Sequence, residues 1–190
     1  MIKIQNYING DLVSPNSGNY FDNISPITGQ VYSQISDSDS SDIDLAVTSA
    51  KEAFSVWSNL SKKERYIHIM HLSDEIEDNF EELVKAESKD NGKPEWLARS
   101  VDIPRASENF RFFATASIHF DSEIHEMDGK AINYTLRQPI GVAGCISPWN
   151  LPIYLLTWKI APALAAGNTV VAKPSEITPM TAYLFSKICQ

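Results

Sequence analysis

The sequence has few cysteines and lacks long apolar runs. Its two cysteines, Cys145 and Cys189, are too few for a disulfide framework. The most apolar stretch, residues 151–166, is shorter than the roughly 20 apolar residues that a membrane-spanning helix needs, and it contains a lysine and two prolines. The N-terminal residues hold no apolar run that could act as a signal peptide. We therefore expect a cytoplasmic protein with no membrane partner.

Positive charge is also scarce. The chain carries 16 lysines and arginines against 24 aspartates and glutamates, which gives a net charge of −8. A surface of this sign repels phosphate backbones and anionic lipids, so we expect no nucleic-acid partner. Hydrophobic residues make up 43% and charged residues 21%, a balance typical of a globular domain.

A convincing set of metal ligands is missing too. Spaced aspartates at 36–44 resemble the start of a calcium loop, but its sixth position is Asp42 in place of glycine and its twelfth is Thr48 in place of glutamate. His68 and His71 share a helix face without a third ligand. We expect a turn and a capped helix start at 36–44, and no metal.

Three stretches have apolar residues at helical spacing, namely 43–57, 61–91 and 94–113. The second begins at a capping box of Ser61 and Glu64, and Asn91-Gly92 ends it, so we expect one continuous helix. Pro104 lies inside the third stretch and should kink or divide it.

The period then changes to that of a strand. After residue 130, apolar residues alternate with polar ones at Ile132, Tyr134 and Leu136, which predicts a half-buried strand. Residues 123–138 as a whole predict a β-ribbon outside the main core, with its turn near Asp128-Gly129.

The last 50 residues predict a strand–helix–strand unit with parallel strands buried on both faces. The strands are 142–146 and 169–172, and an apolar helix joins them. A first turn, Ser147-Pro148-Trp149-Asn150, follows the first strand. A second turn, Lys173-Pro174-Ser175-Glu176, follows the second strand, and a further helix begins near Thr178. Two strands alone leave open edges, so we expect the chain to be a piece of a larger α/β domain.

The two turns should lie side by side at the carboxyl edge of the sheet, where open α/β sheets bind their ligands. Asn150 could donate its amide to a developing oxyanion, or it could simply cap the following helix. Glu176 could accept hydrogen bonds from ribose hydroxyls and Lys173 could donate to the same sugar, or the two could form a solvated pair that caps the next helix. No G-x-G-x-x-G motif follows the first strand. Cys145 lies in a buried strand and neither cysteine is near a base, so we expect inert thiols.

These motifs are specific when taken together. The run from Gly141 to Pro179, GVAGCISPWNLPIYLLTWKIAPALAAGNTVVAKPSEITP, strongly resembles the aldehyde dehydrogenase superfamily, and agreement extends over essentially all 190 residues. The segments 102–114 and 145–168 look most like the 2-hydroxymuconic and 2-aminomuconic semialdehyde dehydrogenase branch.

The resemblance implies the N-terminal part of that α/β fold, with helices, the start of a Rossmann-like parallel sheet and a protruding β-ribbon. It divides the chain into a helical part of the cofactor-binding domain at 1–122, the ribbon of an oligomerisation element at 123–140, and the first βαβ unit at 141–190. The ribbon mediates subunit pairing in the family, so a homodimer or homotetramer is expected.

The resemblance also assigns roles to the two turns. Asn150 matches the asparagine that helps to bind the oxyanion. Four residues match the turn that lies along the cofactor: Ile146, Ser147, Pro148 and Trp149. Lys173 and Glu176 match the residues at the adenosine ribose, with Pro174 and Ser175 shaping that turn. A carboxylate there favours NAD, although many family members also accept NADP.

The implied reaction oxidises a small-molecule aldehyde to a carboxylic acid. A cysteine thiolate attacks the aldehyde and a glutamate activates water, but both lie in later segments of the family, so the 190 residues alone should be inactive. Two alternatives stay open: a truncated or non-catalytic protein on the same scaffold, and a betaine-aldehyde or broad-specificity enzyme of the superfamily.

Overall fold

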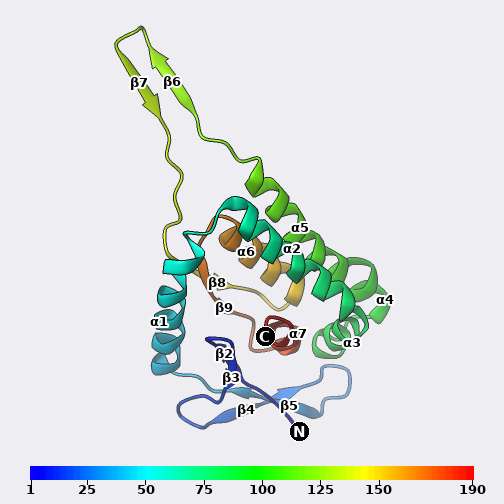
Figure 1. Ribbon diagram of the computed structural model, residues 1–190. Helices are drawn as coiled ribbons and strands as arrows, with labels where there is room; N and C mark the ends of the chain where they lie inside the picture. Colours follow the sequence, from blue (N-terminus) through cyan, green and yellow to red (C-terminus); the bar gives the residue numbers. More distant parts are fainter.

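In the computed structural model, which describes residues 1–190, the chain begins with strands that no sequence pattern predicted. In Figure 1 these strands lie at the N-terminal end of the molecule, beneath the helices. The strands are β1 (Ile2–Ile4), β2 (Asn6–Ile8), β3 (Asp11–Val13), β4 (Tyr20–Ile24) and β5 (Val31–Ser36). β5 pairs with β1 in parallel and with β4 in antiparallel, while β2 and β3 form a hairpin. Describing 1–122 as helical was therefore wrong for its first residues, because strands of three to six residues are too short to show a period.

Helix α1 (Ser40–Trp57) begins as predicted. Asp39 is its N-cap, and its side chain accepts a hydrogen bond from the backbone N–H of Ser41. The Asp42 carboxylate accepts the backbone N–H of Asp39 at 3.0 Å, which completes a capping box. The interpretation of 36–44 as a turn and a capped helix start is confirmed.

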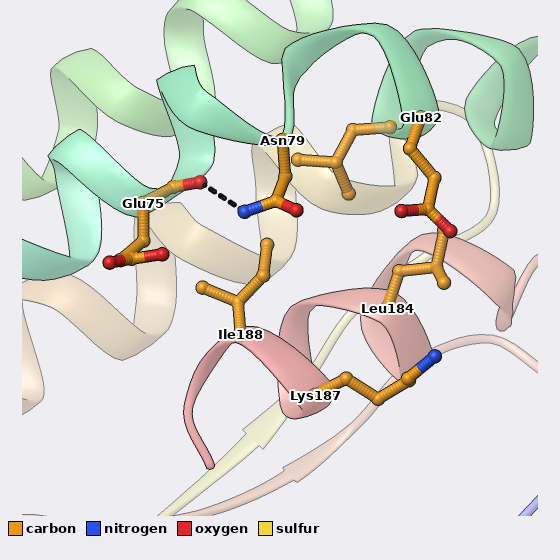
Figure 2. A pocket seen from close by; sticks show the side chains of 7 residues that line it. Glu75, Asn79, Glu82, Leu184, Lys187 and Ile188 are labelled. Carbon is orange, nitrogen blue, oxygen red and sulfur yellow. Dashed lines mark hydrogen bonds between the residues drawn. The ribbon is translucent and has the colours of Figure 1, made fainter.

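The helix predicted at 61–91 is two helices, α2 (Lys62–Asp78) and α3 (Phe80–Asn91). Ser61 starts the first with its capping box and Gly92 ends the second in a left-handed conformation, so both predicted ends are confirmed. The prediction of continuity was wrong, because Asn79 leaves helical geometry at φ −99° and ψ 18°. Its side-chain amide donates to the carbonyl of Glu75 at 2.9 Å, which satisfies the end of α2 (Figure 2).

The third helical stretch changes geometry just before Pro104, but it is not divided, because residues 95–118 stay helical throughout. A short helix α4 (Glu95–Leu97) leads into a π-helical turn, η1 (Ala98–Asp102), and α5 (Ile103–Ile118) follows. Pro104 sits in the first turn of α5, directly after the π-helical turn.

The main core lies between α2, α5 and α6 (Pro152–Ala165), which run side by side in Figure 1. Ile69, Ile76 and Phe110 are fully buried there. The Phe110 ring stacks on Phe185 of α7 (Met180–Ile188) with 5.6 Å between ring centroids. Each such side chain contributes about 1.5–3 kcal/mol through burial, so this helical layer carries the stability of the fold.

The ribbon consists of β6 (Ile124–Met127) and β7 (Ala131–Tyr134), paired in antiparallel. Asp128 and Gly129 take positive φ of 48° and 69° at its tip, the conformation that tight hairpins favour. The ribbon extends away from the body of the molecule in Figure 1, as predicted. The prediction of a half-buried β7 was wrong, because nothing in the chain packs on either face and Ile132 is 70% exposed.

The βαβ unit is confirmed: β8 (Val142–Ile146) and β9 (Thr169–Lys173) are parallel and α6 connects them. Both α1 and α6 contact these strands, and they lie on opposite sides of the strand pair in Figure 1. The prediction that both strands are buried on both faces was wrong at their carboxyl ends, where Ile146 is 71% exposed. Each of these strands pairs only with the other, so neither has a second strand beside it. Across the whole chain, no helix combines the length and apolar character needed to cross a membrane.

Candidate active site

The first and second turns meet at the carboxyl edge of β8 and β9. Ile146 and Lys173 pair in the strand register, and the backbone N–H of Ser147 donates to the carbonyl of Lys173 at 3.0 Å. The structure therefore brings the two predicted segments together, as the crossover rule requires.

Asn150 lies exposed at this edge with its side-chain amide free. The N-cap of α6 is Leu151, and no side chain makes a cap hydrogen bond there. Pro152 in the first turn of α6 removes one of the N–H groups that a cap would satisfy. The alternative interpretation of Asn150 as a helix cap is therefore wrong, and its two N–H donors stay available for a ligand.

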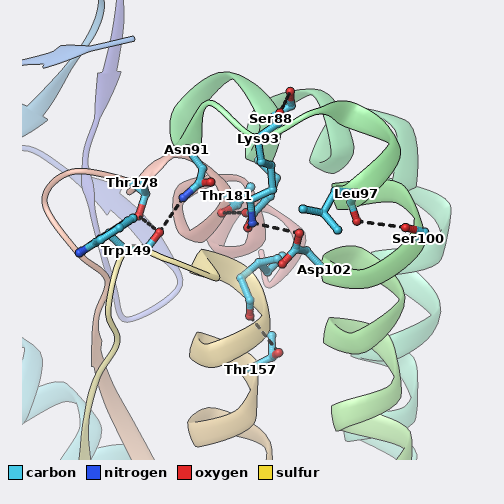
Figure 3. A network of polar contacts seen from close by, with 12 residues as sticks. Ser88, Asn91, Lys93, Leu97, Ser100, Asp102, Trp149, Thr157, Thr178 and Thr181 are labelled. Atoms are coloured by element: carbon cyan, nitrogen blue, oxygen red, sulfur yellow. Dashed lines mark hydrogen bonds and ion pairs between the residues drawn. The ribbon is translucent and has the colours of Figure 1, made fainter. Parts of the chain in front are cut away.

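The peptide group before Asn150 is held by other parts of the molecule (Figure 3). The carbonyl of Trp149 accepts a hydrogen bond from the Asn91 side-chain amide at 2.8 Å and faces the Thr178 hydroxyl at 3.5 Å. Asn91 is the last residue of α3. The local pattern at Asn91-Gly92 predicts only a helix end, and it contains no signal for a contact 58 residues away.

Ser147 has a buried hydroxyl without a partner. Its side chain is 4% exposed, and its Oγ makes no hydrogen bond within the chain. A buried polar group left unpaired costs roughly 1–3 kcal/mol, so this hydroxyl is an unused donor and acceptor beside both turns. Ile146, Pro148 and Trp149 around it are exposed and form an apolar rim.

The second turn is organised around its own charges. Lys173 Nζ lies 3.0 Å from Glu176 Oε2, and the two side chains are 61% and 62% exposed. The pKa of Glu176 is lowered by the hydrogen bond from its own backbone N–H and then by Lys173. The Ser175 hydroxyl accepts the N–H of Ile177 at 3.3 Å, which shapes the turn.

The alternative interpretation of Lys173 and Glu176 is right in one part and wrong in another. They do form a solvated ion pair, which contributes at most about 1 kcal/mol to stability. They do not cap α7, because that helix starts at Met180 and Pro179 is its N-cap. Met180 receives its cap from Asp90 of α3, whose carboxylate accepts the Met180 N–H at 2.7 Å.

Neither cysteine is placed to act as a nucleophile. Burial raises the pKa of the Cys145 thiol, which is only 6% exposed in β8. Burial also raises the pKa of Cys189 to about 12. At neutral pH both therefore stay protonated, which agrees with the interpretation of both as inert thiols. The chain contains no group of three or more histidine, cysteine, aspartate or glutamate side chains placed to hold a metal ion.

Comparison with known proteins identifies the family that this chain resembles. A model described as "Aldehyde dehydrogenase family" matches residues 12–190. The mouse 2-aminomuconic semialdehyde dehydrogenase is 50% identical over 189 residues, which are 99% of this chain and 38% of that protein. The 2-hydroxymuconic semialdehyde dehydrogenase of Pseudomonas sp. strain CF600 is 44% identical over 100% of this chain and 40% of its own length.

Solved structures agree with the sequence relatives. The NAD⁺ complex of an aldehyde dehydrogenase from Bacillus cereus superimposes with a TM-score of 0.94 at 37% identity, over 98% of this chain and 38% of that one. PnpE in complex with nicotinamide adenine dinucleotide gives a TM-score of 0.93 at 40% identity, over 97% of this chain and 38% of that one. The chain thus spans about two fifths of the length of the proteins it matches.

Proposed function

The chain belongs to the aldehyde dehydrogenase family, and on this premise we propose that the full-length protein oxidises a small-molecule aldehyde to a carboxylic acid with NAD. The observation that carries the proposal is the edge of β8 and β9. A free neutral amide, Asn150, lies there beside a turn that carries an exposed carboxylate and an exposed ammonium group.

Asn150 acts as the oxyanion donor in this proposal. An aldehyde carbonyl that is attacked by a thiolate gains negative charge on its oxygen, and a preorganised amide N–H stabilises that charge by about 3 kcal/mol. In this proposal the thiolate comes from a segment outside these 190 residues, because Cys145 is buried, Cys189 is half-buried, and burial raises the pKa of both thiols.

The residues of both turns fit a dinucleotide. Glu176 offers carboxylate oxygens to ribose hydroxyls, and Lys173 offers a donor on the same side. The unpartnered Ser147 hydroxyl supplies a third polar group, while Pro148 and Trp149 give the apolar rim. Bound NAD supplies the hydride acceptor. A carboxylate repels a 2′-phosphate, so NAD is preferred over NADP.

Ile146, Pro174 and Ser175 complete the binding surface in this proposal by shaping the two turns. The protein is cytoplasmic, and 1–122 and 141–190 belong to its cofactor-binding domain. Residues 123–140 pair subunits into a homodimer or homotetramer, which is supported by the exposed apolar side chains of the ribbon: Ile124, Met127, Ile132 and Tyr134. Because relatives act on muconic semialdehydes by name, an aldehyde of that class is the proposed substrate.

The test uses the full-length protein with NAD and a panel of aldehydes that includes a muconic semialdehyde and betaine aldehyde. We expect aldehyde-dependent NADH formation, fastest with the semialdehyde. Asn150→Ala should lower kcat about 100-fold or more and leave NAD affinity nearly unchanged, because the amide acts on the developing charge.

Asn59→Ala is the matched control, since the Asn59 amide bonds only the Ser55 carbonyl within α1. Absence of NADH formation with every aldehyde would favour a non-catalytic protein on this scaffold. An unchanged kcat in Asn150→Ala would refute the oxyanion role alone.

A further inference from the structure

The hydrogen bond between Asn91 and Trp149 links the end of α3 to the residue next to Asn150. We propose that Asn91 is a positioning residue that aims the Asn150 amide; this inference rests on the proposed function. The carbonyl that Asn91 holds at 2.8 Å belongs to the peptide bond between Trp149 and Asn150.

The planarity of the peptide bond makes this contact effective. The Trp149 carbonyl and the Asn150 N–H lie in one rigid plane, so fixing the carbonyl also fixes the direction in which the Asn150 Cα leaves it. The Asn150 side chain has no hydrogen bond of its own within the chain, and α6 begins without a side-chain cap. The orientation of Asn150 therefore depends on the peptide before it.

Asn91 is itself held firmly. It ends α3, and Gly92 follows at φ 83° with its N–H donated to the Ser88 carbonyl at 2.8 Å. The Ser88 hydroxyl donates to the carbonyl of Lys93 at 2.6 Å, which ties the chain back to the helix. A rigid helix end can transmit a defined position to the carbonyl it binds.

The side chain of Lys93 anchors the end of α3, and Figure 3 shows its ammonium group reaching Asp102. Its ammonium group lies 3.1 Å from Glu87 and 2.9 Å from Asp102, and all three side chains are at least nine-tenths buried. Glu87 also accepts the Thr181 hydroxyl at 2.8 Å, which joins α3 to α7. The last turn of α3 is thus attached to η1 through Asp102 and to α7 through Thr181. Asn91, at the end of that turn, then contacts Trp149.

Stability and position can be separated at Asn91. The bond to Trp149 is exposed to solvent, so its loss should change stability by only about 1 kcal/mol. A shift of the reacting group of about 1 Å can lower a rate about 100-fold. If the contact is purely structural, its loss should lower the melting temperature. If it positions Asn150, its loss should lower kcat.

The experiment compares Asn91→Ala with Asn79→Ala in the full-length protein. Asn79 is a matched control: it also lies at the end of a helix and loses an equivalent amide-to-carbonyl bond, to Glu75 at 2.9 Å (Figure 2). We expect kcat to fall about 10- to 100-fold in Asn91→Ala, with KM for NAD unchanged. Asn79→Ala should keep kcat. Asn91→Asp, which keeps the size but loses the donor, should repeat the loss.

A double-mutant cycle decides the route of the effect. If Asn91 acts through Asn150, Asn91→Ala should lower kcat no further in the Asn150→Ala background. An equal fold-loss in both backgrounds, or an unchanged kcat in Asn91→Ala and Asn91→Asp, would overturn the inference. If Asn150→Ala alone keeps full kcat, the oxyanion proposal fails instead, so the two failures are distinguishable.

Discussion

The two turns at the carboxyl edge are built in opposite ways. The first turn is placed by distant parts of the chain, through Asn91 and Thr178 on the Trp149 carbonyl, while its own polar side chains stay free. The second turn is held by a pair of its own side chains, Lys173 and Glu176, which are well exposed to solvent.

This difference suggests that the first turn sets the direction of a catalytic donor, whereas the second turn contributes to the affinity for a ligand. A turn that leaves its polar groups free and is positioned from outside suits a catalytic donor, whose direction must be exact to fractions of an ångström. An exposed ion pair can reorganise around a ligand with little loss of stability. We therefore expect changes around the first turn to affect rate, and changes in the second turn to affect cofactor binding.

The largest expected effect removes the buried ion pairs that hold the end of α3, from which Asn91 supports the first turn. Lys93→Met leaves Glu87 and Asp102 buried without their cation, and breaking such a pair costs about 3–5 kcal/mol. We expect the free energy of unfolding, measured with urea, to fall by that amount. Lys85→Met on the exposed face of α3 is the control and should change it little. Similar losses in the two variants would mean that the buried cluster does not stabilise the end of α3.

The same cluster should respond to pH. Burial raises the pKa of Glu87 to about 7, because one ammonium group cannot balance two buried carboxylates. Between its usual pKa of 4.5 and this value, the folded state binds more protons than the unfolded state. The contribution of Glu87 to stability should therefore fall as pH rises through this window.

Glu87→Gln isolates that contribution, because it removes the titrating group and keeps its size. Urea unfolding at several pH values should show that the stability of the wild type relative to Glu87→Gln decreases as pH rises from about 4.5 to about 7. A constant difference across that range would argue that Glu87 is ionised throughout.

Much of the fold could be predicted from the sequence, because many of its signals are local. The capping box at Ser61, the turn at Asp128-Gly129 and the βαβ unit at 142–173 each depend on a few neighbouring residues. Those predictions are confirmed. The break at Asn79 was missed because the apolar stripe continues across it, and only the backbone conformation shows the interruption.

The supports of the first turn could not be predicted in the same way. Asn91 and Trp149 are 58 residues apart, and Glu87 and Thr181 are 94 apart. Such contacts depend on how helices pack, which no local period encodes. The partly exposed ends of β8 and β9 likewise depend on which elements reach them, so apolar composition alone predicted too much burial.

A smaller effect is expected in the second turn. Glu176→Gln should weaken NAD binding by the full-length protein about 10-fold, because a carboxylate bonds ribose hydroxyls more strongly than an amide does. NADP binding should change less, since the repulsion of its phosphate is lost as well. Glu52→Gln on α1 is the control. Calorimetric titration with both cofactors measures this, and equal losses for NAD and NADP would argue against the ribose assignment.

The smallest effect tests whether the polar groups of the first turn are truly free. Ser147→Ala removes a buried hydroxyl that has no partner, so the free energy of unfolding without ligand should stay the same or rise by up to about 1 kcal/mol. Ser73→Ala is the contrast, because the Ser73 hydroxyl lies 2.7 Å from that of Ser107 and its loss should destabilise the fold. If Ser147→Ala destabilises as much as Ser73→Ala, the Ser147 hydroxyl already has a structural partner. The first turn would then be held from within, as the second is, and the contrast between them would disappear.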